Sequence, residues 1–538
     1  MKTASMRLAD DLVTGLSTGR GRSRKRSVAG GLVWLWLAAA GAASAQVTDA
    51  PAPAEPAAEE RKAGLWVLPR ISVGLTHTNN SLQASTTPES DNILELSPGV
   101  HAVFNTARVR GDFDYSLTAI HFGNNTQADS TQQALDAYAN IDLWGNRVFL
   151  DLAGVIDQQS ISAFGTQSAD TNRNANLTQQ TRFLVSPYYR GGLTKGTELE
   201  ARYTHSIARS DAQERSDYSQ QGMTVVLRNR REQGQRLGWN LEAGVQNADY
   251  TLERETTARA VKAGLSYDIT AYLTGTAFVG AERNDVLTTE TESYSSWGVG
   301  VDWRPSDRSR VSGDLEHHYY GNAHNLALEH RTGRTLWRFS DWRNVVGSSL
   351  DEAVPLMSSN YDLLDSYYLG LEADPIRRAQ LVEAELERLG FTNTEDLYRR
   401  FLTSSSRLDR NQQLAVLLNG ARSVYTIAIG QNRSQRLDSD SAPLGDDFDT
   451  NESITQRYWG LQYAHRLTPV SSMTVALSGM KTEGVGSNLS ESSKILQIGF
   501  ATQLAPRTSG SVRLQRMAVS GTAAYNETSW RALITHRF

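Results

Sequence analysis

Hydrophobic and polar residues alternate over many short stretches of the chain, up to its last residue. In the closing stretch WRALITHRF, the apolar side chains of Trp530, Ile534 and Phe538 share one parity, and Arg531 and Arg537 lie on the other. Alternation with a period of two predicts a β-strand with one apolar and one polar face. A strand of roughly this length is also long enough to cross a bilayer at a tilt.

The same alternation recurs along the chain, with connections of two kinds between the alternating stretches. Short segments rich in turn-forming residues, such as LTKGTE and LTPVSS, alternate with longer polar loops such as SAFGTQSADTNRNANLT. Short turns on one side and long loops on the other are typical of an outer-membrane barrel. We therefore predict an all-β transmembrane fold over residues 65–538, an antiparallel outer-membrane β-barrel of about 20 strands, with a range of about 18 to 22. The alternative, a soluble β-sandwich or β-solenoid, would need several domains whose boundaries the sequence does not show.

One region, residues 347–419, interrupts the alternation and is predicted to be a small α-helical insertion within the barrel. The pair Asp374-Pro375 is typical of a helix start, and apolar residues then recur at helical spacing. A second short helix is expected after Thr394, and a third over the segment RLDRNQQLAVLLNGA. The apolar face of the insertion, which would plug the lumen or dock a periplasmic partner, is formed by Val382, Leu386, Leu389 and Phe401.

The number of strands decides on which side of the membrane the insertion is expected. A single-chain bacterial barrel has an even number of strands, so both of its ends lie on the periplasmic side. Counting strands back from Phe538 places the insertion on the periplasmic side, provided that residues 312–332 form one long strand. A hairpin turn at Gly321-Asn322 would make the count odd.

The N-terminal region predicts secretion. Basic residues cluster at positions 20–26, an apolar run covers positions 28–43, and Ala43-Ser44-Ala45 matches a signal-peptidase cleavage site. Residues 1–45 are therefore predicted to be a signal peptide rather than a membrane anchor, because the run is short. Residues 46–64 are rich in proline and alanine and are predicted to be a periplasmic linker.

Composition and charge narrow the class further. Seven of the 54 Lys and Arg and two of the 59 Asp and Glu lie in residues 1–45, so the remainder has 47 basic and 57 acidic residues and a formal net charge of −10. This charge disfavours nucleic acid as a partner. With 39% hydrophobic residues, no cysteine and no further long apolar run, the chain can enter the outer membrane of a Gram-negative cell only as a barrel. Outer-membrane lipid and the barrel-assembly machinery are then the expected partners.

Three stretches resemble a known family of proteins. They are residues 72–100 (SVGLTHTNNSL followed by ESDNILELSPGV), residues 317–340 (HHYYGNAHNLALEHRTGRTLWRFS) and residues 401–427 (FLTSSSRLDRNQQLAVLLNGARSVYTI). They resemble the large outer-membrane β-barrel proteins associated with the PEP-CTERM/exosortase system of Gram-negative bacteria. His77 and Asn79 depart from the aromatic and acidic residues expected there. The resemblance implies a setting in exopolysaccharide production and surface-protein sorting, and because no reaction is established for the family, no functional residue carries over.

Candidate chemistry is sparse. The acidic loop at positions 438–452 lacks the spacing of a calcium-binding loop and is predicted to be a solvated extracellular loop. Its acidic residues are Asp438, Asp440, Asp446, Asp447, Asp449 and Glu452. His317 and His318 point to opposite faces of a strand and cannot easily share one ion with His324. A barrel-embedded hydrolase would need a Ser/His pair, and no spacing singles one out. We therefore expect no catalytic residue, no metal and no cofactor.

Charged residues on the polar parity are the better candidates for function. Inward-facing charges tune which solutes pass through a barrel, or they pair with each other and only hold its shape. The terminal Phe538 is a candidate signal for the assembly machinery. We predict a non-enzymatic pore or scaffold that assists export or surface attachment of exopolysaccharide or surface proteins, with a general diffusion porin as the alternative and a hydrolase as the second alternative. The predicted lumen-lining charges are Asp112, Asp114, Arg466, Arg513, Arg531 and Arg537.

Overall fold

The computed structural model describes residues 64–168, 174–211, 217–231, 234–251, 254–346, 360–369, 371–372, 375–389, 401–403, 406–437 and 445–538. The predicted signal peptide and residues 46–63 of the predicted linker lie outside the described residues. The helix start at Asp374 and the second helix after Thr394 also fall largely outside them.

The described chain contains 22 strands, all joined in one antiparallel sheet. The number lies at the upper end of the predicted range. The strands are β1 (Gly64–Thr78), β2 (Asp91–Asn105), β3 (Val109–Phe122), β4 (Ser130–Trp144), β5 (Val148–Ser160), β6 (Leu177–Thr194), β7 (Thr197–Ser210), β8 (Tyr218–Asn229), β9 (Leu237–Tyr250), β10 (Thr256–Thr270), β11 (Leu273–Asn284), β12 (Glu292–Ser306), β13 (Ser309–His318), β14 (Gly321–Arg331), β15 (Thr335–Val346), β16 (Arg407–Asn419), β17 (Ser423–Arg436), β18 (Ser453–Thr468), β19 (Ser471–Val485), β20 (Ser490–Ala505), β21 (Thr508–Gly521) and β22 (Tyr525–Arg537).

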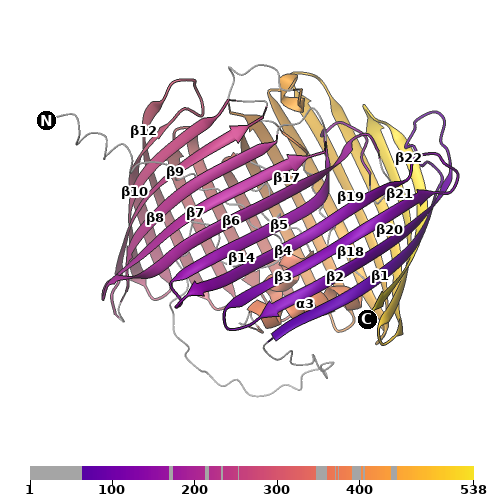
Figure 1. Cartoon of the computed structure of the whole chain (residues 1–538), viewed down its shortest axis with the longest axis horizontal. Coiled ribbons are helices and arrows are strands. Elements are labelled where there is room, and N and C mark those ends of the chain that lie inside the picture. The colour runs from indigo at the N-terminus through magenta and orange to yellow at the C-terminus, as the bar shows by residue number, and fades with distance from the viewer. Residues whose placement is uncertain are drawn as a thin grey trace.

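The sheet closes on itself. The first strand, β1, pairs with the last, β22, in a register that runs from Arg70 opposite Arg537 to Thr78 opposite Ser529. Every other strand pairs with its neighbours in the sequence, and the strands tilt around the wall in the same sense (Figure 1). Closure satisfies the backbone hydrogen bonds of both end strands, which is the condition for a sheet to cross a membrane. The predicted all-β antiparallel barrel is confirmed.

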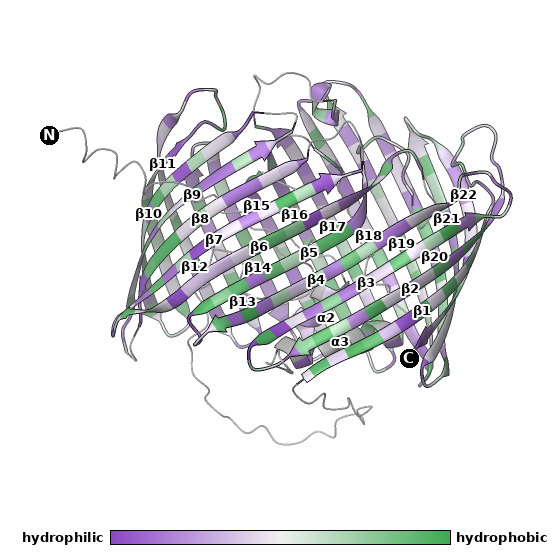
Figure 2. Cartoon of the chain, viewed as in Figure 1, coloured by the Kyte–Doolittle hydropathy of each residue, from purple (hydrophilic) through white to green (hydrophobic). Residues whose placement is uncertain are grey.

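The alternation of residue types becomes an alternation of faces. On β1, the side chains of Val73 and Leu75 are exposed on the outer face, whereas that of Thr76, which points toward the lumen, is buried. On β22, Trp530 and Ile534 are exposed on the same outer face. Figure 2 shows hydrophobic and hydrophilic positions alternating along the strands. An outer surface of this kind faces lipid, so the chain is an outer-membrane barrel of a Gram-negative cell.

The two ends of the barrel differ in the length of their connections. At the end that holds the first residue of β1 and the last of β22, nine of the ten connections between strands have only two or three residues. At the opposite end several connections are much longer, among them residues 161–176, 347–406 and 437–452. Short periplasmic turns and longer extracellular loops are the rule in such barrels. The end that holds the first residue of β1 and the last residue of β22 is therefore the periplasmic end.

The helical insertion is smaller than predicted and begins on the other side. Two helices are described in it, α2 (Asn360–Tyr368) and α3 (Pro375–Leu389). The predicted third helix is wrong, because Arg407–Asn419 forms strand β16, and Phe401 forms a single β-bridge to Ser160 rather than part of a helix. Among the described residues, neither helix is long and apolar enough to span a membrane.

Two errors in the predicted strand count cancelled each other. Residues 312–332 do not form one strand: β13 and β14 are joined by a two-residue turn at Tyr319-Tyr320, with Gly321 at a φ of 93° directly after it. The missed turn and the missed strand β16 together keep the total even. The insertion lies between the extracellular ends of β15 and β16, not on the periplasmic side.

Candidate functional site in the barrel lumen

The two helices lie inside the barrel, against its inner wall. Wall residues Leu336, Leu417 and Val424 are fully buried, whereas their neighbours Trp337 and Leu418 are exposed on the outer face. The buried set therefore faces the lumen, where it forms one apolar cluster with the helices. The helix residues in that cluster are Tyr361, Leu363, Leu364, Ala379, Val382, Leu386 and Leu389.

The helices lie near the periplasmic end although their segment enters from the extracellular end. Leu336, Leu417 and Val424 are each within a few residues of a periplasmic turn, and Figure 1 shows α3 at that end of the barrel. The two described helices therefore lie at the opposite end of the lumen from the strand ends Val346 and Arg407 that flank their segment.

Polar contacts fix α2 to the wall and to α3. Asn360 donates to the Gln462 side chain on β18 at 2.7 Å, and Arg338 on β15 donates to the Ser366 hydroxyl at 2.8 Å. An Arg378–Asp365 ion pair joins the two helices at 2.7 Å. These bonds orient a pair of helices whose main attachment is apolar.

A loop folds inward across the extracellular end. Residues 161–176, which connect β5 and β6, carry Ser162 and Ala163, and both donate to the Asp447 carboxylate at 2.7 and 2.6 Å. Asp447 belongs to the connection between β17 and β18, far from β5 around the ring. The loop therefore bridges the mouth of the barrel.

Further contacts of this loop involve other parts of the rim. The Tyr525 hydroxyl on β22 donates to the Gln167 carbonyl, and Asn174 donates to the Gln83 side chain at 2.8 Å. An apolar cluster beside the Asp447 contact completes the closure. Its members are Ala163, Phe164, Phe401, Phe448 and Ile454.

The predicted plug face is divided between these two regions. Val382, Leu386 and Leu389 are buried against the wall at the periplasmic end, and Phe401 is buried in the extracellular cluster. The four residues do not form one surface, and none of them is exposed to receive another protein.

Of the predicted lumen-lining charges, the two aspartates lie on the inward parity of β3. Asp114 accepts two hydrogen bonds from the Arg70 guanidinium, each 2.7 Å long. Arg70 reaches it across β2 at Gly99, where a Cβ atom would come within 3.1 Å of Arg70 Nε. Asp112 lies 3.5 Å from a ring nitrogen of His101.

The predicted arginines lie on the inward parity of β18, β21 and β22. Arg531 pairs with the buried Glu95 on β2. Arg513 lies on β21. Arg466 and Arg537 line a pocket at the periplasmic end. Phe538 donates its backbone N–H to the Pro69 carbonyl at 3.0 Å and leaves its side chain exposed.

Several inward charges were not predicted, and they too are paired. Arg202 donates to Asp151 at 2.8 Å, and Arg182 donates to Asp157 at 2.7 Å. Their alternating positions on β5, β6 and β7 carry the same signal as the predicted ones. Pairing of opposite charges along the wall therefore extends well beyond the residues that the sequence singled out.

The histidines and the acidic loop have structural partners. His318 faces inward between Glu282 at 2.6 Å and Glu316 at 2.7 Å, whereas His317 lies on the other face beside Asn322. In the acidic loop, Asp446 caps a short 3₁₀ helix (Asp447–Asp449), and Asp438 and Asp440 lie outside the described residues. Within the described residues, no group of three or more His, Asp or Glu could hold a metal ion.

No protein-family model matches the sequence, and no curated protein matches it significantly. Among solved structures, the barrel is similar to the apoprotein form of the FrpB iron transporter from Neisseria meningitidis, with a TM-score of 0.48, 9% identity, and coverage of 88% of this chain and 81% of that one. It is also similar to the siderophore receptor PirA from Acinetobacter baumannii, with a TM-score of 0.45, 8% identity, and coverage of 89% and 81%. At these identities the similarity concerns the fold and says nothing of a ligand or substrate.

Proposed function

We propose that the protein is a non-enzymatic outer-membrane channel that its own helical insertion plugs, and that a polar solute or polymer passes when the insertion is displaced. The observation that carries this proposal is the apolar cluster between α2, α3 and the inner faces of β15 to β18. A barrel of about this size has a lumen that needs a plug to be closed. Helices from the middle of the chain, seated in the lumen, meet that need.

The chemistry of the wall supports a polar cargo. Charges of both signs face the lumen and most of those described are paired, as in Arg70–Asp114 and Arg202–Asp151. A wall of paired charges is hydrophilic without a strong net field, which suits a neutral or weakly charged hydrophilic passenger. The resemblance of three stretches to exosortase-associated barrels makes exopolysaccharide, or a surface protein on its way to attachment, the passenger that we favour, with a periplasmic export partner.

A general diffusion porin is the second candidate function. The inward contacts of the described residues 161–168 and 174–176 favour it, because a porin narrows its lumen with such a loop. A porin would conduct steadily with the helices in place, so conductance separates the two candidates.

The test compares single-channel conductance in planar bilayers for the full chain and for a version that lacks residues 350–403. Val346 and Arg407 are paired across β15 and β16, so a short Gly/Ser connector can close the gap without loss of either strand. We expect the full chain to conduct little and the deletion to open a large, steady pore. Equal conductance of the two would refute the plug and leave the diffusion porin.

A crosslink provides the matched control. The chain has no cysteine, so Asn360→Cys with Gln462→Cys places one unique thiol pair where the two native side chains touch. Joining the thiols with a short bis-maleimide should hold the channel closed under conditions that open the wild type, and each single-cysteine variant should behave as wild type.

A further inference from the structure

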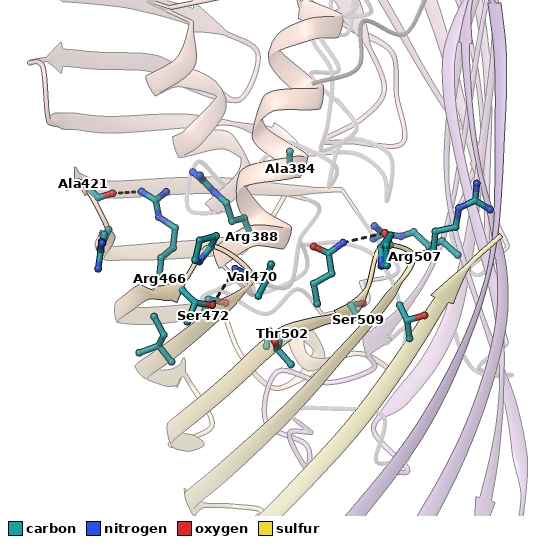
Figure 3. A pocket seen from close by; sticks show the side chains of 18 residues that line it. Ala384, Arg388, Ala421, Arg466, Val470, Ser472, Thr502, Arg507 and Ser509 are labelled. Carbon is teal, nitrogen blue, oxygen red and sulfur yellow. Dashed lines mark hydrogen bonds between the residues drawn. The ribbon is translucent and has the colours of Figure 1, made fainter. Parts of the chain in front are cut away.

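A pocket of about 750 Å³ opens at the periplasmic end of the barrel. Its walls come from α3 on one side and, on the other, from the turns after β16, β18 and β20 and the end of β22. Figure 3 shows Arg388 on the helix directed toward Arg466 on the wall, with Arg507 across the pocket from them. The pocket therefore spans the boundary between the inserted helix and the barrel.

The lining is strongly basic. Among the described residues that form it there is no Asp or Glu. Like charges that converge in a confined space repel each other, and the repulsion is relieved when an anion lies between them. The arginines of the lining are Arg388, Arg422, Arg466, Arg507 and Arg537.

Two of these arginines are incompletely neutralised. Arg388 pairs with Glu385 of its own helix, yet burial and the nearby charge of Arg466 lower the pKa of Arg388. Arg466 donates to the Ala421 carbonyl, whereas its buried Nε has no hydrogen-bond partner within the described residues. A buried donor without a partner costs free energy that a bound acceptor would recover.

We propose that this pocket binds a ligand with at least two oxyanion groups, carboxylate or phosphate, held between Arg388 on the helix and Arg466 and Arg507 on the wall. Guanidinium groups bind both kinds of oxyanion through paired hydrogen bonds. Two groups are required because the arginines approach the pocket from opposite sides.

Such a ligand would also act on the plug. It would bridge α3 and the wall, and so replace the repulsion between Arg388 and Arg466 with attraction to a shared anion. This consequence rests on the proposed function, whereas binding itself does not. An oxyanion would thus favour the closed channel.

The direct test is calorimetric titration of the full chain, in a neutral detergent, with inorganic pyrophosphate as the probe. We expect saturable binding that weakens as salt is added, and a loss of about tenfold or more in affinity for Arg388→Gln with Arg466→Gln. Arg457→Gln is the matched control, because Arg457 lies on the same strand as Arg466 but pairs with Glu483 outside the pocket. Absence of binding to the wild type, or an equal loss in the control, would overturn the site.

Two further measurements keep the outcome clear. Heat-dependent mobility in gels verifies that each variant retains a folded barrel. Repeating the titration in nanodiscs of phosphatidylcholine, with or without phosphatidylglycerol, distinguishes the source of the oxyanion: competition by the anionic lipid supports a headgroup, and undiminished binding supports a soluble ligand. If pyrophosphate binds but does not reduce channel opening, the binding site is supported and its proposed effect on the plug is refuted. If the deletion of residues 350–403 does not open the pore, the proposed function is refuted, whether or not pyrophosphate binds.

Discussion

Leu386→Ala tests the attachment of the plug most directly. Leu386 lies on α3 with 3% of its surface exposed, in the apolar cluster that joins the helix to the wall. The wall itself is held by continuous ladders of backbone hydrogen bonds between β15, β16, β17 and β18. Truncating the side chain should therefore weaken the seating of the helix and leave the barrel intact.

The magnitude follows from the burial. Replacing a buried leucine with alanine costs about 2–5 kcal/mol, depending on how far the cavity collapses. Because the wall does not depend on the helix, most of this cost should fall on the equilibrium between the seated and the displaced insertion. At about 1.4 kcal/mol for each factor of ten, the displaced population should rise about 30-fold to about 4,000-fold.

The assay is the open probability of single channels in planar bilayers, together with the rate at which a protease cuts the insertion. Leu371→Ala is the matched control, since it removes the same atoms from a leucine that is 72% exposed just after α2. We expect both readouts to rise for Leu386→Ala and neither to change for Leu371→Ala. If the open probability and the cleavage rate of Leu386→Ala equal those of the wild type, the helix does not gate the lumen and the reasoning fails.

Three further predictions concern the mouth, the wall and the terminus. Asp447→Ala removes the acceptor of Ser162 and of the adjacent backbone N–H, at about 1.5–3 kcal/mol for each charged hydrogen bond, and should speed proteolysis of residues 161–176 in intact cells. Arg70→Ala leaves Asp114 without its bidentate partner, and one more net negative charge on the wall should shift the reversal potential in a salt gradient toward cation selectivity, measured on the deletion that opens the pore. Removing Phe538, whose side chain is 60% exposed, should lower the amount of barrel assembled in the outer membrane with little effect on its melting temperature.

Each of these has an outcome that contradicts it. An unchanged cleavage rate for Asp447→Ala would mean that the mouth is closed by the apolar cluster alone. A reversal potential that does not move in Arg70→Ala would place the ion pair away from the path of the ions. Normal assembly without Phe538 would show that the machinery reads another part of the chain, and a lowered melting temperature would make the residue structural.

The wall of the barrel was predictable because its physics is local. Every second residue of a strand faces lipid and must be apolar, so β1, β3 and β22 can be recognised from their own residues. The mouth was not predictable, because Asp447 meets Ser162 through a contact 285 positions apart in the sequence. Such contacts depend on which strands stand opposite each other, and the sequence does not carry that information in any one segment.

Strand β16 was mistaken for a helix for a specific physical reason. In its periplasmic half, both faces are apolar: Leu414 and Val416 alternate with Ala415 and Leu417, which pack against the helices. A continuous apolar run loses the period of two and resembles a buried helix. The inward apolar residues that pack against the helices therefore hide the alternation by which β16 could be recognised as a strand.

The same departure from alternation shows that the inner wall of β16 matches the seat of the two helices. On β16 the inward residues change from Asn411 and Gln413, toward the extracellular end, to Ala415 and Leu417 where the helices lie. A leucine side chain that faced a water-filled lumen would contribute no stability by burial. Under a helix Leu417 is fully buried, and this burial stabilises the packed state by about 1.5–3 kcal/mol. The inner face of β16 is therefore polar toward the extracellular end and apolar where the helices are seated, so substituting Leu417 with a polar residue should release the helices while β16 keeps its place in the sheet.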